Sequence, residues 1–282
     1  MPIEVSFAVL CAALLHAAWN AMLKGGRDVL LDTAAIVIGA GLLAVPFLFF
    51  VQIPAAAAWP YLLGSITTHV AYYYLMINAY RNGDLSLVYP LMRGVAPLIT
   101  AVLGMILLQE LPSPVSWIGM LLISVGVIAL ALNPGKAGAR KDTAKSVRFA
   151  LANAAVIAVY TLIDGAGARL AGDPWGYIVW LFVLDALPFA LYMLATHRSE
   201  LFSGLAERRY RGLVGGGFSA AAYGISVWAM TKAPVALVAS LRETSVLFAA
   251  LIGARVLKEH LTPRRWAGVL AVVAGVISIK VG

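Results

Sequence analysis

Charge is the scarcest property of this chain. Only 12% of its 282 residues are Asp, Glu, Lys or Arg, and 62% are hydrophobic. Soluble domains carry roughly 25% charged and about 45–50% apolar residues. No acidic residue occurs between Asp32 and Asp84, and no Lys or Arg occurs between Arg27 and Arg81. A soluble helix needs a polar outer face, so these stretches exclude a soluble fold and predict membrane-spanning helices of about 20 residues each.

Cysteine is nearly absent as well. The single residue, Cys11, lies inside an apolar run and excludes an internal disulfide framework or a multi-cysteine metal site. The net charge of +8 comes from basic residues in short breaks between apolar runs, as in cytoplasmic loops, which argues against nucleic-acid binding. The first apolar run lacks a basic leader and a small-residue cleavage site, which indicates a mature helix and not a signal peptide. We expect no metal and no cofactor.

The apolar runs predict an all-α polytopic membrane protein with ten transmembrane helices. A long run in lipid must be helical, because the hydrocarbon offers no partner to open backbone. Hydropathy and clusters of Pro, Gly and charge place the spans near residues 5–23, 33–51, 59–80, 85–108, 115–133, 147–167, 175–196, 211–230, 234–256 and 266–280. The ninth is the least regular, since Arg242, Glu243 and Arg255 interrupt it.

The chain repeats itself at an offset of 149 residues. The offset aligns Arg93 with Arg242, Glu110 with Glu259, Pro114 with Pro263, and Trp117 with Trp266. Arg, Glu, Pro and Trp do not recur in register by chance in an apolar chain. We therefore expect two five-helix repeats, residues 1–133 and 147–282, joined by a basic linker at 134–146. Five spans per half is an odd number, so the halves lie inverted in the membrane, as in many secondary transporters.

The basic residues also predict the orientation. Fifteen of the 21 Lys and Arg residues fall in or beside the first, third, fifth, seventh and ninth loops, whereas Arg169, Lys232 and Lys280 lie in the even loops or the termini. Cytoplasmic loops carry the excess of Lys and Arg. The odd loops are therefore expected in the cytoplasm and both termini on the outer face of a bacterial inner membrane.

Four motifs resemble the drug/metabolite transporter superfamily, specifically its ten-helix EamA-type members. They are His16-Ala17-Ala18-Trp19-Asn20, Tyr89-Pro90-Leu91-Met92-Arg93-Gly94, Ile163-Asp164-Gly165, and the series Glu259, Pro263, Trp266 and Gly268. The chain is similar to a bacterial aromatic amino-acid exporter of that family. The resemblance implies a central cavity lined by the first four helices of each half. His16 stands where the small multidrug-resistance branch has a glutamate, which argues against proton-coupled export of lipophilic cations.

Charged residues inside the spans mark the candidate substrate site. A charge near the bilayer centre costs at least about 2.5–3.5 kcal/mol, so each requires an explanation. Arg93 and Arg242 are expected either to bind a substrate carboxylate bidentately or to form structural ion pairs. Glu243 follows Arg242 directly, so the two side chains diverge. Glu243 is expected either to receive a substrate ammonium group or carry a proton, or to form a salt bridge with another helix. Asp164 and Asp185 are the other buried acids.

Histidines and aromatic residues complete the predicted site. His16 and His69 fall near the middle of their spans. They are expected to serve as interhelical hydrogen-bonding groups, as proton sensors or as substrate contacts. Mid-span Tyr73, Tyr89, Tyr160 and Trp228 are candidates for the cavity wall, which ligand sites commonly build from aromatic and a few polar groups. The expected partners are a small-molecule substrate and the lipid bilayer, and the protein is expected to work as a monomer.

The pattern predicts an exporter of small metabolites, most simply amino acids with aromatic or other neutral side chains, working by alternating access. A carrier of phosphate esters or nucleotide sugars, or a proton-coupled drug exporter, is the alternative. An intramembrane enzyme is the distant rival, because Asp164 and Asp185 imitate a carboxyl dyad. The Gly-x-Ser-x-Gly and His-Glu-x-x-His motifs are missing, and we expect no enzymatic activity.

Overall fold

The structure, a computed structural model, describes residues 1–24, 28–82, 85–131, 143–256 and 262–282, and within these ranges it contains helices and no strands. The α-helices are α1 (Ile3–Lys24), α2 (Val29–Ala44), α3 (Trp59–Asn82), α4 (Leu85–Leu107), α5 (Pro114–Ala131), α6 (Thr143–Leu170), α7 (Pro174–Thr196), α8 (Arg198–Tyr210), α9 (Gly216–Met230), α10 (Val235–Arg242), α11 (Ser245–Val256) and α12 (Pro263–Val281). Short 3₁₀ segments lie at Val45–Phe49 and Ala56–Ala58, and a π-helical segment, η4, lies at Arg211–Gly215.

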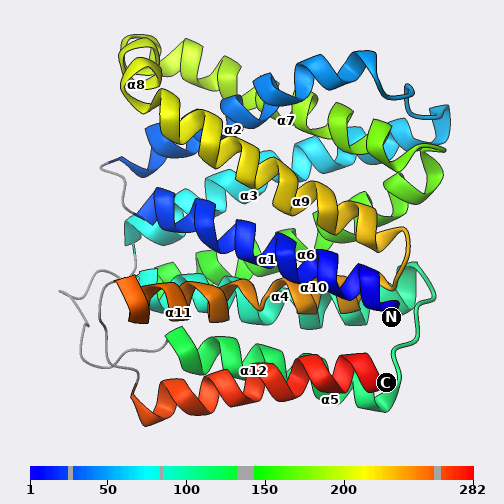
Figure 1. Cartoon of the computed structure of the whole chain (residues 1–282). Helices are drawn as coiled ribbons and strands as arrows, with labels where there is room; N and C mark the ends of the chain where they lie inside the picture. Colours follow the sequence, from blue (N-terminus) through cyan, green and yellow to red (C-terminus); the bar gives the residue numbers. More distant parts are fainter. Residues whose placement is uncertain (25–27, 83–84, 132–142, 257–261) are drawn as a thin grey trace.

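The helices run lengthwise beside one another, and both termini lie at the same end of the bundle (Figure 1). The Lys280 ammonium donates a hydrogen bond to the Met1 carbonyl oxygen at 2.9 Å, which ties the two chain ends together. The helices α5 and α12 form one edge of the bundle, and α2, α7 and α8 lie at the opposite edge (Figure 1). We call the end that carries Met1 and Gly282 the terminal end.

Each of the ten expected spans coincides with helical structure. Six helical stretches in the described ranges are long and apolar enough to cross a membrane: 3–22, 30–49, 87–107, 144–170, 174–196 and 207–230. The main shift in a boundary is at the eighth span, where α8 continues through the π-helical η4 into α9. A lower share of apolar residues sets α3 apart, since its sequence includes Ser, Thr, His, Asn and several Tyr residues.

The ninth span is broken in its middle. The helix α10 ends at Arg242, and α11 begins at Ser245. At the interruption the Leu241 carbonyl oxygen accepts from the Thr244 backbone N–H at 3.1 Å and from the Thr244 hydroxyl at 2.8 Å. Such irregular backbone is tolerated at membrane depth only where protein or a cavity surrounds it, and discontinuous helices commonly build transporter binding sites. The break presents Arg242 and Glu243 to the centre of the bundle.

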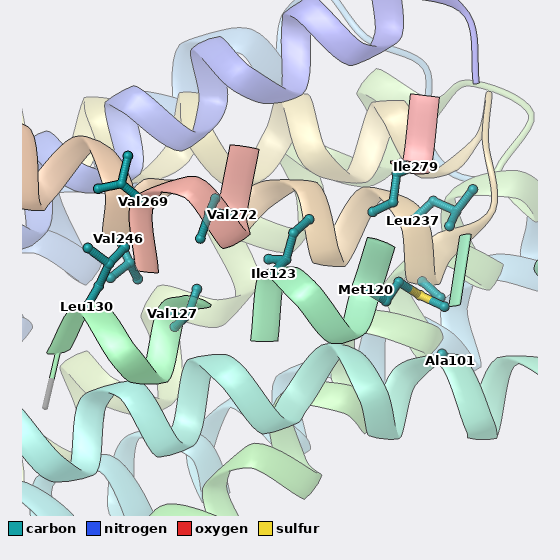
Figure 2. Packing of buried hydrophobic residues seen from close by; sticks show 11 residues of the cluster. Ala101, Met120, Ile123, Val127, Leu130, Leu237, Val246, Val269, Val272 and Ile279 are labelled. Atoms are coloured by element: carbon teal, nitrogen blue, oxygen red, sulfur yellow. The ribbon is translucent and has the colours of Figure 1, made fainter. Parts of the chain in front are cut away.

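Glycines bring α5 and α12 into close contact along their length. A methyl group on Gly126 would meet the Gly268 carbonyl oxygen at 2.8 Å, and one on Gly119 would meet the Gly275 carbonyl oxygen at 2.8 Å. Around this seam the apolar side chains of both helices pack with residues of α4, α10 and α11 (Figure 2). The absence of side chains at these glycines permits the close contact between the two helices.

A buried carboxylate holds α2 to the segment before α9. Asp32 is 1% exposed, and its Oδ1 lies 2.9 Å from Nε of Arg208 and 3.6 Å from Nη1 of Arg211. Next to it the backbones of α2 and η4 meet at Gly39 and Gly212, where a side chain would overlap the neighbouring chain. Asp32 was not among the predicted site residues, because it stands just before the predicted start of the second span.

Candidate substrate-binding site

A small cavity of about 10 Å³, with room for about one water molecule, lies between α1 on one side and α3, α4 and α6 on the other. The lining side chains are mostly aromatic or amide-bearing: His16, Trp19, Asn20, Tyr72, Tyr80, Tyr89, Met92, Arg93, Asn153 and Ile157. The α1 residues of this wall lie more than ten positions after Val5, a residue of the terminal end. At 1.5 Å per residue the cavity is therefore displaced by roughly 15 Å or more toward the opposite end.

Arg93, from α4, forms an ion pair with Glu243, which lies in the break between α10 and α11. The Arg93 Nε and the Glu243 Oε2 are 2.8 Å apart, and both side chains are at most 5% exposed. Nη2 of Arg93 has no hydrogen-bond partner. The pair joins the two halves of the chain at the edge of the cavity. Neutralisation by Glu243 offsets the cost of burying the Arg93 charge.

Arg242 is buried without a carboxylate partner in the described part of the chain. It is 3% exposed, and its Nε and Nη1 have no hydrogen-bond partner. The guanidinium lies over the Tyr223 ring, 5.2 Å from the centroid, and forms a hydrogen bond with Tyr160. A cation–π contact contributes on the order of 1 kcal/mol, far less than an ion pair would give a buried guanidinium. Nε and Nη1 of Arg242 therefore remain unsatisfied N–H donors in the described part of the chain.

Asp164, on α6, is completely enclosed by hydroxyl donors. It is 0% exposed and accepts hydrogen bonds from Tyr177 at 2.9 Å and from Tyr223. Because Tyr223 also lies under the Arg242 guanidinium, the tyrosine links the buried anion to the buried cation. Asp164 therefore orients the ring that positions Arg242, and it does not belong to the cavity wall.

His69 and Asp185 form a second polar group between α3 and α7. The His69 Nδ1 lies 3.0 Å from the Ser65 carbonyl oxygen, and since a carbonyl only accepts, Nδ1 is the donor in this hydrogen bond. Asp185 accepts a hydrogen bond from the Tyr73 hydroxyl at 2.9 Å, and its Oδ1 lies 3.9 Å from Nδ1 of His69. The imidazole stacks on Tyr160 with the ring centroids 4.3 Å apart.

The sequence-predicted residues fall into three groups. His16, Tyr89 and Arg93 line the cavity. A layer of buried and half-buried residues lies beside it, joined by the contacts described above: Arg242, Glu243, Tyr160, His69, Tyr73, Asp164 and Asp185. Trp228 is apart from both groups, with its indole stacked on Trp175 at 6.5 Å.

Several cavity residues were not among the predicted site residues. Asn153 is the clearest case: it is fully buried in the apolar α6 and donates to the Met92 sulfur at 2.9 Å. Asn153 could have been selected from the sequence because its side-chain amide interrupts an otherwise apolar stretch of the sixth span. Tyr72 and Tyr80 belong to a run of tyrosines whose inward members cannot be identified without knowing the rotation of α3. The two acidic residues of the imagined dyad, Asp164 and Asp185, are each held by tyrosines of their own.

No group of three or more His, Cys, Asp or Glu side chains in the described ranges is arranged to hold a metal. Among the described residues the site instead contains the Arg242 guanidinium without a carboxylate partner, the buried Arg93–Glu243 ion pair and aromatic walls. That chemistry suits the binding of a small polar molecule that carries an anionic group and an apolar or aromatic part.

Comparison with known proteins agrees with this architecture. Residues 4–132 and 144–281 each match the EamA-like transporter family. The chain belongs to this family and is a multi-pass membrane transporter. A family of transporters points away from enzymatic activity.

Two relatives add detail. The chain is 25% identical over 225 residues to "Uncharacterized transporter YwfM" of Bacillus subtilis (strain 168), covering 79% of this chain and 74% of that protein. A solved crystal structure, 18% identical, superposes with a TM-score of 0.77 over 98% of both chains. At this identity the structural likeness shows the fold alone.

Proposed function

We propose that this transporter exports amino acids with aromatic or other neutral side chains across the bacterial inner membrane by alternating access. The observation that carries the proposal is the buried Arg242, whose Nε and Nη1 lack partners. A buried, unpaired guanidinium is costly, and a substrate carboxylate would offset that cost by bidentate hydrogen bonding. The substrate is thus expected to carry a carboxylate.

The ion pair beside Arg242 supports a zwitterionic substrate. Glu243 adjoins Arg242 in the chain and already pairs with a cation, Arg93, at 2.8 Å. A substrate ammonium group is suited to the same carboxylate. Around these charges the rings of Tyr89, Tyr72 and Trp19 supply a wall for an aromatic or apolar side chain. A phosphate ester or nucleotide sugar would bring more negative charge than one unpaired guanidinium balances.

The membrane arrangement proposed is ten spans in two inverted five-helix repeats, residues 1–133 and 147–282. It is supported by the helices observed at all ten stretches and by the separate family matches to each half. The excess of Lys and Arg in the odd loops supports cytoplasmic loops at the end opposite the termini. In this orientation the cavity is displaced toward the cytoplasm, which suits loading of a substrate for export.

The direct test is uptake of a labelled amino-acid panel into proteoliposomes, with phosphate esters and nucleotide sugars as competitors. Arg242→Ala is expected to abolish transport while the protein still purifies as a monodisperse species. Arg242→Lys is expected to restore it only in part, because an ammonium cannot make the bidentate contact. Normal transport by the alanine variant, or competition by phosphate esters alone, would contradict the assignment.

A further inference from the structure

The terminal end of the bundle is closed by a cluster of contacts that the substrate site does not use. Glu110 follows α4 in the chain, and Arg169 stands in the last turn of α6. Their side chains form an ion pair, with Arg169 Nη2 2.6 Å from Glu110 Oε1. Arg169 is one-third exposed and Glu110 is 12% exposed, so the pair lies at the boundary between the core and the surface.

Both side chains also form hydrogen bonds with the backbone of the turn between α9 and α10. Glu110 Oε2 accepts from the backbone N–H of Val235, the first residue of α10, at 2.7 Å. Arg169 donates to the carbonyl oxygens of Met230 at 2.9 Å and Ala233 at 3.1 Å. Each charge faces the helix end that it complements, since free N–H groups carry partial positive charge and free carbonyls partial negative charge.

These contacts connect opposite walls of the cavity. The helices α4 and α6 contribute Arg93 and Asn153 to one wall. The opposite wall, α1, packs on α9 and α10, and its Val5 belongs to the same apolar cluster as Met230 and Val235. The helix α10 also packs on α4, and α9 packs on α6. An opening in which α9 and α10 move with α1 away from α4 and α6 at the terminal end separates Glu110 and Arg169 from the α9–α10 turn.

We propose that Glu110 and Arg169 form a latch that closes the route from the cavity to the terminal face, and that substrate release requires the latch to open. The inference rests on the proposed transport function. It concerns access to the cavity and not the chemistry of the substrate. Breaking the latch raises the fraction of molecules whose cavity is reachable from the terminal face.

The geometry distinguishes this latch from a simple ion pair. An exchange of the two charges, Glu110→Arg with Arg169→Glu, keeps opposite charges together. It also directs a cation at the N–H of Val235 and a carboxylate at the carbonyls of Met230 and Ala233. The exchanged pair is therefore expected to fail as a latch, whereas a simple ion pair would be restored.

The test uses a single reporter cysteine. Cys11 is the only cysteine in the chain, so Cys11→Ala with Ile157→Cys places one thiol on the cavity wall. A membrane-impermeant maleimide is applied to right-side-out and to inverted vesicles without substrate. We expect the parent to label from the face opposite the termini. In Glu110→Gln, Arg169→Gln and the exchanged pair, labelling from the terminal face should rise roughly tenfold or more. Glu4→Gln, an exposed acid near the same end, is the matched control and should behave as the parent.

Continued labelling from the opposite face in each variant shows that the protein has folded. Unchanged terminal-face labelling in the folded Glu110 and Arg169 variants would overturn the latch, and so would restoration of the parent pattern by the exchanged pair. Because no substrate is present, the result stands even if amino acids prove not to be transported.

Discussion

Arg93 and Glu243, 150 residues apart in the chain, meet as a buried ion pair 2.8 Å apart, whereas the repeat-related Arg242 beside them has no acidic partner in the described ranges. The two arginines occupy equivalent positions in the repeat but differ in their electrostatic surroundings. Arg93 is neutralised by Glu243, whereas Nε and Nη1 of Arg242 have no hydrogen-bond partner in the described ranges. This asymmetry supports substrate binding at Arg242.

The first prediction concerns the stability of the ion pair. Glu243→Gln leaves the Arg93 charge buried without compensation and should destabilise the fold by about 3–5 kcal/mol. The double variant Glu243→Gln/Arg93→Met removes both charges and should recover most of the loss. The stabilities of the single and the double variant are measured by thermal unfolding in detergent, monitored by tryptophan fluorescence. A double variant less stable than Glu243→Gln would show that the pair itself does not account for the effect.

The second prediction concerns Asp164. Tyr177→Phe removes one of its hydroxyl donors and leaves a fully buried carboxylate less satisfied, at a cost of about 1–3 kcal/mol. Tyr74→Phe, on an exposed side chain, is the control and should change stability by no more than about 0.5 kcal/mol. Equal unfolding temperatures for the two variants would contradict the role assigned to Tyr177.

The third prediction tests the seam between α5 and α12. Gly126→Ala puts a methyl group 2.8 Å from the Gly268 carbonyl oxygen and should destabilise by about 1–3 kcal/mol through overpacking. Gly64→Ala is the matched control, since its methyl would meet only Ile163 at 3.7 Å. A helical glycine with such room should tolerate or benefit from the change. Equal melting temperatures for both variants would refute the tight seam.

The fourth prediction concerns orientation. The chain ends lie together, so a single fusion reports on both. A periplasm-active reporter fused after Gly282 should be active, and the same reporter inserted in the 136–145 loop should be inactive, because the basic loops remain in the cytoplasm. The opposite pattern of activities would reverse the proposed topology and the direction of loading.

The fifth prediction concerns energy coupling. An antiporter needs a carboxyl group that binds proton and substrate in competition. Here the carboxylates of Asp164 and Asp185 accept hydrogen bonds from tyrosines, and Glu243 forms an ion pair with Arg93. Each carboxylate is thus already occupied by a protein group. We therefore expect counterflow of labelled amino acid without any ion gradient and no accumulation when a pH gradient is imposed. Concentrative uptake that is lost in Asp185→Asn would show that the proton is coupled through the His69–Asp185 group.

Much of the helical layout was accessible from the sequence. Apolar runs and their Pro, Gly and charged interruptions are local properties, and the helix is the local solution that lipid permits. Even the irregular ninth span was visible as an apolar run broken by Arg242 and Glu243, where the structure ends α10. The candidate charges Arg93, Arg242, Glu243, Asp164 and Asp185 could be selected for the same reason, since each interrupts an apolar run.

The apolar runs and their interruptions do not predict which residue each buried charge pairs with. Whether Glu243 pairs with a neighbour or stays free depends on how α4 and the α10–α11 break are rotated and placed, and the apolar patterns of fully buried helices do not encode that rotation. The contacts of Asp32 with Arg208 and of Glu110 with Arg169 join segments 176 and 59 residues apart.

The sequence alone determined which segments are helical and which of them carry buried charge, because both follow from the cost of exposing backbone and charge to lipid. Only the tertiary structure decided which charges neutralise one another and which guanidinium remains free, because that outcome depends on distances between helices remote in the chain.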